Sequence, residues 1–238
     1  MPWANTKRFY KQAGYEAADG GFALTFDGRP AHTPEGNPLV LASERLVQAV
    51  AREWADQDED IRAEAMPITG LACTAIDRVK NGRQAIIDHT VKYAATDLLC
   101  YRAEGPQELK RHQQAQWQPL LDWAAEKFGA RLAATEGIIP KAQPRAALEK
   151  LRRAVEALGD LQLTAVAAAT QASGSLIISL ALVHGHITTE EAAAASQLDE
   201  TWQNQKWGEG PEQTERLEAL KKEIRAVAAL IKLTDDFI

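Results

Sequence analysis

The sequence has few of the features from which a function is usually inferred. It contains only two cysteines, Cys73 and Cys100, and their spacing is not that of a metal-binding or redox pair. Two cysteines also cannot form a disulfide framework, so we expect a reducing compartment. The most apolar stretch, residues 163–183, is interrupted by polar residues and glycine. We interpret it as two buried helices rather than a membrane span, and expect no membrane insertion.

Common catalytic motifs are also missing. The chain has no phosphate-binding loop of the G-x-x-x-x-G-K-[ST] type and no G-x-G-x-x-G after a predicted strand. The stretch QASGSL lacks the glycines of a nucleophile elbow. His184 and His186 flank Gly185 without the spacing of a zinc motif, and the glycine is better explained as a helix C-cap. We therefore expect no catalytic residue, no cofactor and no metal.

The net charge of −6 argues against a nucleic-acid partner, which would require a basic surface. Acidic residues are concentrated late in the chain: residues 161–210 hold five acids against one cation, Lys206. Two interpretations remain open, a set of solvated helix faces or an acidic recognition surface. The first residues contain no continuous apolar stretch, so we expect no secretory signal.

The patterning predicts an α+β fold in which a small N-terminal β-rich domain precedes a larger C-terminal α-helical domain. Turn signals at Asp19-Gly20-Gly21 and Asp27-Gly28 bracket the strand candidate FALTF. Ser43 reads as the N-cap of a helix, and from Pro67 onward apolar residues recur at helical spacing. We place the β-rich domain, with one helix at its end, at residues 1–66 and the helical domain at 67–238.

Three helix boundaries are predicted from capping and breaking residues. Asn81 should begin a new helix, and Pro119 should kink or split the helix at 107–128. The capping box Thr188-x-x-Glu191 should open one helix that runs to Gly208.

The segment LDETWQNQKWG, residues 198–208, carries two tryptophans among polar neighbours. At 100° per residue, Trp202 falls with Leu198 on the side that should face the core. Glu200 and Trp207 lie on a line roughly 140–160° away. Trp207 either fills a groove against the last helix or belongs to a protein-binding patch, and both readings remain open.

Six stretches occur in an order that resembles the assembly chaperones for the alpha subunit of the F-type ATP synthase catalytic head. They are FDGRPAHTPEGNPLVL, REWADQ, MPITGLACTAID, TDLLCYRAEGP with QAQWQPLLDWA, GSLIISLAL and LDETWQNQKWG. Together they extend from about residue 26 to residue 208, and the family's fold, an N-terminal β-domain joined to an α-helical domain, agrees with the fold predicted above.

The resemblance implies a chaperone rather than an enzyme. Such a protein holds the unassembled alpha subunit, shields the surface that later contacts the beta subunit, and needs no nucleotide. It would be a monomer when free, in the bacterial cytoplasm or, as a processed eukaryotic form, in the mitochondrial matrix. The family motifs point to Trp54, Asp77, Asp199, Glu200, Trp202 and Gln203. Together with the helix geometry, this makes Asp199, Glu200, Gln203 and Trp207 our candidates for binding the partner, and Trp54, Asp77 and Trp202 candidates for either structure or binding.

Two other classes of function remain open from the sequence. A small-molecule enzyme could use Asp77, Asp97 or Glu200 as acid–base groups in an interdomain cleft. A structural scaffold could oligomerise through its tryptophan-containing helices.

Overall fold

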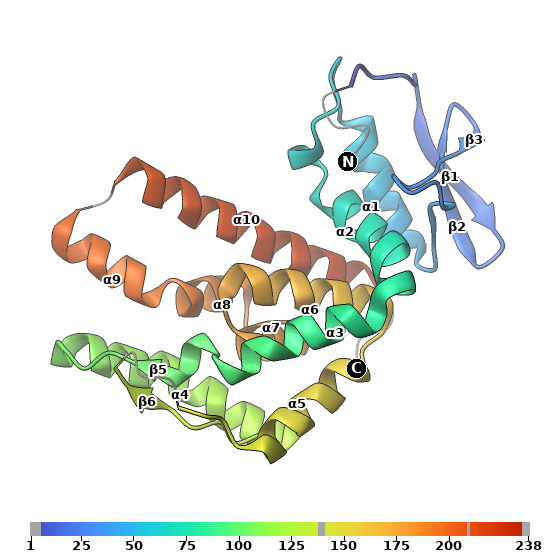
Figure 1. Ribbon diagram of the computed structural model, residues 1–238. Helices are drawn as coiled ribbons and strands as arrows, with labels where there is room; N and C mark the ends of the chain where they lie inside the picture. Colours follow the sequence, from blue (N-terminus) through green and yellow to red (C-terminus); the bar gives the residue numbers. More distant parts are fainter. Residues whose placement is uncertain (1–5, 138–140, 209, 235–238) are drawn as a thin grey trace. The chain divides into compact units, whose positions relative to one another are not determined.

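A computed structural model describes residues 6–137, 141–208 and 210–234 (Figure 1). The chain divides into two compact units: unit 1 comprises Met1–Arg83, Asp160–Ala165 and Ala226–Ile238, and unit 2 comprises Gln84–Gly159 and Val166–Arg225. A small sheet in the N-terminal region and a larger helical part confirm the predicted α+β class. The domain boundary at residues 66 and 67 stays a prediction.

The elements of unit 1 are β1 (Ala13–Ala18), β2 (Gly21–Phe26), β3 (Arg29–Pro30), β4 (Val40–Leu41), α1 (Glu44–Ala55), η1 (Ala63–Ala65), α2 (Pro67–Thr74) and η2 (Ala75–Val79). Those of unit 2 are η3 (Leu98–Cys100), β5 (Tyr101–Arg102), α4 (Gln107–Phe128), β6 (Thr135–Glu136), α5 (Arg145–Glu156), α7 (Leu176–Val183), α8 (Thr189–Ser196) and α9 (Leu198–Trp207). Residues of both units occur in α3 (Lys80–Ala95), α6 (Asp160–Ser173) and α10 (Pro211–Leu233).

The sheet of unit 1 is built on the hairpin of β1 and β2, which pair antiparallel across the predicted Asp19-Gly20 turn. The other edge of β2 pairs with β3 and with β4. Gly21 is required there, because its φ is +144° and a Cβ atom would lie 2.2 Å from the Leu41 carbonyl oxygen. The strand predicted for FALTF is confirmed within β2.

Helix α1 packs on this sheet through its buried apolar residues, Leu46, Val47, Val50, Ala51 and Trp54. The Ser43 hydroxyl accepts a hydrogen bond from the Leu46 amide at 3.4 Å, which confirms Ser43 as the N-cap. At the other end, Trp54 is 2% exposed and its ring lies 4.7 Å from that of Phe26 and 5.7 Å from that of Tyr10. The Tyr10 hydroxyl donates to the Trp54 carbonyl at 2.6 Å. This aromatic cluster joins α1 to the strands.

The predicted start of a new helix at Asn81 is displaced by one residue. The helical path through α2, the π-helical turn η2 and the start of α3 is broken at Gly82, with φ −132° and ψ 24°, and a second helical segment follows. The Asn81 side chain does not cap that segment but donates to the Asp77 carbonyl at 3.2 Å. The π turn contains Asp77, which is buried and accepts hydrogen bonds from Thr33 and Asn37. Contacts remote in sequence therefore set this helix, which a capping rule could not predict.

Unit 2 is organised around α4, which packs on α5, α7 and α9. Pro119 does not split this helix, contrary to one of the predicted alternatives, and Gly129 ends it in the left-handed conformation as expected. Residues 163–183 form parts of α6 and α7, separated at Gly174, so the prediction of two helices there is confirmed. No helix among the described residues is long and apolar enough to cross a membrane.

A fully buried carboxylate lies at the start of α7. Asp97 accepts hydrogen bonds from the Ser175 hydroxyl at 2.7 Å, the Ile177 amide at 3.1 Å and the Leu99 amide at 3.1 Å. Burial raises the pKa of Asp97 to about 6, although these donors act in the opposite direction. The motifs TDLLCY and GSLIISLAL thus meet in one hydrogen-bond cluster, which gives both a structural role.

Replacing Trp54 by arginine should destabilise the fold by several kcal/mol, roughly 3–5, because it removes aromatic packing and buries a charge. Urea unfolding or thermal melting measures the loss. Trp54→Phe is the control, since it keeps an apolar ring and should cost less. A well-folded arginine variant would contradict the buried position of Trp54.

The free energy of unfolding should fall as the pH rises from about 4 to about 6, because folded Asp97 binds a proton more readily than the unfolded chain. The difference is on the order of 3 kcal/mol between the ends of that interval. Asp97→Asn cannot titrate, so its urea-unfolding profile should be flatter than the wild type's, whereas the exposed Asp58→Asn should preserve the slope. Equal slopes for wild type and Asp97→Asn would refute the assignment.

Candidate protein-binding site

The candidate residues divide between the two units. Trp54 and Asp77 belong to unit 1, where one lies in the aromatic cluster and the other in the hydrogen-bond network of η2. The remaining candidates, Asp199, Glu200, Trp202, Gln203 and Trp207, all lie on α9 in unit 2. The structure therefore brings together the residues of LDETWQNQKWG, and these define the site.

Helix α9 is separate from α8, so the prediction of one helix from Thr188 to Gly208 is wrong. The capping box of Thr188 and Glu191 is present, but Gln197 leaves the helical conformation with φ −114° and ψ 14°. Its side-chain amide donates to the Leu217 carbonyl of α10 at 3.2 Å, and Ser196 bonds back to the Ala192 carbonyl at 2.6 Å. Such side-chain bonds to the backbone compete with helix continuation.

The inward face of α9 is formed by Leu198 and Trp202, as the spacing predicted. Trp202 is 7% exposed. The Lys206 ammonium lies 5.5 Å from the centre of its ring and pairs with Glu108 of α4 at 3.0 Å. Trp202 therefore packs under a cation that is itself tied to the neighbouring helix, which makes it part of the attachment of α9 to α4.

Asp199 also faces inward. It accepts a hydrogen bond from the Gln113 side chain at 2.8 Å, and Gln113 in turn accepts one from the Ala103 amide at 2.8 Å and, through its carbonyl, one from the Arg102 guanidinium. Burial raises the pKa of Asp199, with smaller opposite effects of Gln113 and Arg102. Burial likewise lowers the pKa of Arg102, which lies over the ring of Trp117 at 5.2 Å. This network attaches α9 to α4 and β5.

The outward face of α9 carries Glu200, Gln203 and Trp207. The Glu200 side chain is 46% exposed, and its carboxylate lies 3.9 Å from the Arg216 guanidinium of α10, a weak pairing at that distance. Gln203 is exposed. Trp207 is 75% exposed and touches Trp202 edge to face, with ring centres 5.9 Å apart. The reading in which Trp207 fills a groove against the last helix is wrong, because three quarters of its surface is exposed.

The three carboxylates weighed as acid–base groups lie in different environments. Asp97 is fully buried and holds the start of α7, and Asp77 is held by side chains of the loop at residues 33–37. Glu200 stands on the surface of α9. Among the described residues, no group of three or more His, Cys, Asp and Glu side chains is arranged to hold a metal ion. His186 instead stacks on Trp123 at 4.9 Å.

Sequence reasoning missed the residues that hold α9 in place. Arg102, Gln113 and Glu108 precede α9 by about ninety residues or more, and no local spacing connects them to it. The one available signal was that QAQWQPLLDWA and LDETWQNQKWG occur in the same set of motifs. Trp117 of the first donates through its indole nitrogen to the Ala195 carbonyl at 2.9 Å, immediately before the second.

Comparison with known proteins identifies relatives over almost the whole chain. The family of the ATP12 chaperone protein matches residues 7–125. A crystal structure of Atp12 from Paracoccus denitrificans is 38% identical and superimposes with a TM-score of 0.91, covering 96% of this chain and 98% of that one.

Two further relatives agree. The structure of a candidate chaperone from Agrobacterium tumefaciens is 36% identical with a TM-score of 0.90, covering 95% of this chain and 85% of that one. The mitochondrial protein atp12 of Schizosaccharomyces pombe is 27% identical, over 99% of this chain and 86% of that protein. The chain therefore belongs to the ATP12 chaperone family, the ATP synthase assembly chaperones that its motifs resemble.

Proposed function

We propose that this protein binds the unassembled alpha subunit of F-type ATP synthase and shields the surface that later contacts the beta subunit. Membership of the ATP12 chaperone family supports a chaperone role, and the resemblance of the six motifs supports the alpha subunit as its client. An unpaired subunit of an alternating ring exposes a large apolar patch, and such patches aggregate unless they are covered. The client is therefore a folded or nearly folded subunit with an exposed interface.

The observation that carries the proposal is the exposure of Trp207 at the end of a helix that is otherwise firmly attached. Trp207 leaves three quarters of its surface open to a partner, and tryptophan is enriched among residues that dominate binding energy. Glu200 and Gln203 lie beside it on the same face and would supply polar recognition. Asp199 and Trp202 hold this face in position through the contacts of α9 with α4. Trp54 and Asp77 have structural roles in unit 1.

A half-polar site of this kind suits a chaperone that must release its client. One aromatic anchor surrounded by polar contacts gives a modest affinity, and exchange between related complexes is governed mainly by the dissociation rate. The Glu200 carboxylate on this face favours a basic group on the client. We expect the free protein to be a monomer, which sizing at several concentrations would test against the scaffold alternative.

Trp207→Ala should leave the fold nearly unchanged, within about 0.5 kcal/mol, because most of the side chain is already in water. Capture of the alpha subunit on co-expression should fall by roughly 30-fold or more if Trp207 anchors the complex. Phe9→Ala changes the other large exposed apolar side chain among the described residues and should retain capture; because the Phe9 ring also lies 5.4 Å from that of Phe26, its melting curve is measured as well. Normal capture by the Trp207 variant would remove α9 from the binding surface.

The Glu200→Lys variant should likewise melt near the wild-type temperature. It should capture much less alpha subunit, since the substitution reverses a charge on the proposed face. Glu126→Lys makes the same change on the exposed face of α4 and should retain capture. Trp202→Ala should act differently, losing roughly 3–5 kcal/mol of stability because the ring is buried. Thermal melts measured beside pull-down yields separate a role in binding from a role in the fold.

Calorimetric titration with ATP or ADP and magnesium should give no saturable heat, because the sequence has no phosphate-binding loop. The titration uses the purified protein without any client. Binding in the micromolar range would revive the enzyme alternative.

A further inference from the structure

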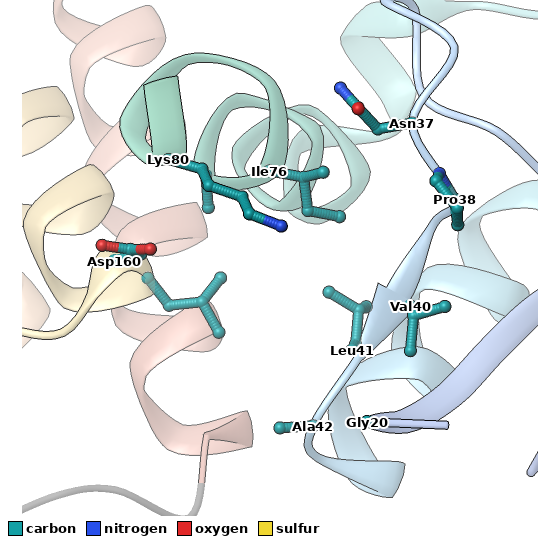
Figure 2. A pocket seen from close by; sticks show the side chains of 11 residues that line it. Gly20, Asn37, Pro38, Val40, Leu41, Ala42, Ile76, Lys80 and Asp160 are labelled. Atoms are coloured by element: carbon teal, nitrogen blue, oxygen red, sulfur yellow. The ribbon is translucent and has the colours of Figure 1, made fainter. Parts of the chain in front are cut away.

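Unit 1 contains a groove that none of the roles described above uses. It has a volume of about 400 Å³ and runs along β4 opposite η2 (Figure 2). Its apolar lining comes from Val40 and Leu41 of the strand, Ile76 of the π turn and Leu161 at the start of α6. Val40, Ile76 and Leu161 are each partly exposed.

The groove is held open by the Asp77 network. Asp77 accepts hydrogen bonds from the Asn37 side chain at 2.8 Å, from the Glu35 amide at 3.3 Å and from the Thr33 hydroxyl. These bonds tie the loop that leads into β4 to the turn that forms the opposite wall. Because both walls are fixed before any partner arrives, binding in the groove would require little reorganisation.

The short strand that lines the groove has an outer edge that no described strand covers, although its Val40 amide already donates to the Pro38 carbonyl at 3.1 Å. β4 is bonded to β2 along one edge, and in the described sheet no strand pairs with its other edge. An exposed strand edge can accept an extended peptide as an additional strand, with backbone hydrogen bonds giving affinity and pockets selecting side chains. The shape therefore favours an extended segment over a compact small molecule.

The charged side chains at the groove indicate which kind of segment would bind there. The Lys80 side chain points into the groove (Figure 2), and its ammonium group has no ion pair or hydrogen bond with any described residue. Asp160, the acid across the groove, is already paired with Arg83 at 2.6 Å. An unneutralised cation beside apolar walls is complementary to a carboxylate next to an aliphatic side chain.

We infer that this groove is a second docking site, which binds an extended segment of the client protein carrying an aspartate or glutamate beside an aliphatic residue. The identity of the client rests on the proposed function. The aliphatic side chain contacts Val40, Ile76 and Leu161, and the carboxylate pairs with Lys80.

The test uses the full-length protein and purified alpha subunit. Lys80→Glu should weaken binding by about ten-fold, because it replaces an attraction by a repulsion in a partly desolvated site. Lys92→Glu, which reverses an exposed charge further along α3, should change the affinity less than two-fold, about the effect of a screened surface charge. Ala42→Phe fills the groove without removing a native contact and should weaken binding as Lys80→Glu does. Melting curves confirm that each variant is folded.

A photo-crosslinking residue at Ile76 locates the bound segment directly. The expected product is an adduct with an alpha-subunit peptide that contains an acidic and an aliphatic residue side by side. If Glu200→Lys abolishes capture while Lys80→Glu and Ala42→Phe bind normally and Ile76 gives no adduct, the groove is not a docking site and the proposed function stands. If the wild-type protein captures no alpha subunit at all, both proposals are overturned together.

Discussion

The placement of α9 depends on a carboxylate that is turned away from solvent. Asp199 accepts the Gln113 amide at 2.8 Å, and Gln113 also holds Ala103 and Arg102, so one acid closes a network linking α9, α4 and β5. Removing it would leave a buried amide donor without its acceptor, which costs more than the bond itself contributes. Asp199 and Glu200 are adjacent on one helical turn. Fixing the first inward therefore orients the second outward.

Sequence alone was sufficient wherever a local rule decided the structure. The strand FALTF, the Ser43 cap and the C-cap at Gly129 each follow from residues within a few positions of one another. The inward position of Trp202 follows from helical periodicity, which tertiary contacts reinforced rather than opposed. The α+β class follows from these locally determined strands and helices.

The failures occur where residues remote in sequence compete with a local rule. Asn81 has the chemistry of an N-cap, yet its side chain donates to the carbonyl of Asp77, whose carboxylate is held by a loop some forty residues earlier, and the helix break falls one residue later, at Gly82. Gln197 breaks a predicted helix because its amide bonds α10, twenty residues later. No spacing in the sequence encodes either partner. The exposure of Trp207 was equally inaccessible, since it depends on where neighbouring helices end.

The two proposed binding surfaces have the same two components. Each joins an apolar contact to a charge that is weakly paired or unpaired within the chain: Trp207 with Glu200, and the β4 groove with Lys80. Neither would hold a client tightly by itself, because little apolar area is buried and the charged groups remain near water. A client that reaches both is held by their combined effect, since the second contact forms within the complex. It can also be released in steps. If a competitor displaces the client from one surface, the remaining contact alone holds it more weakly, which favours release.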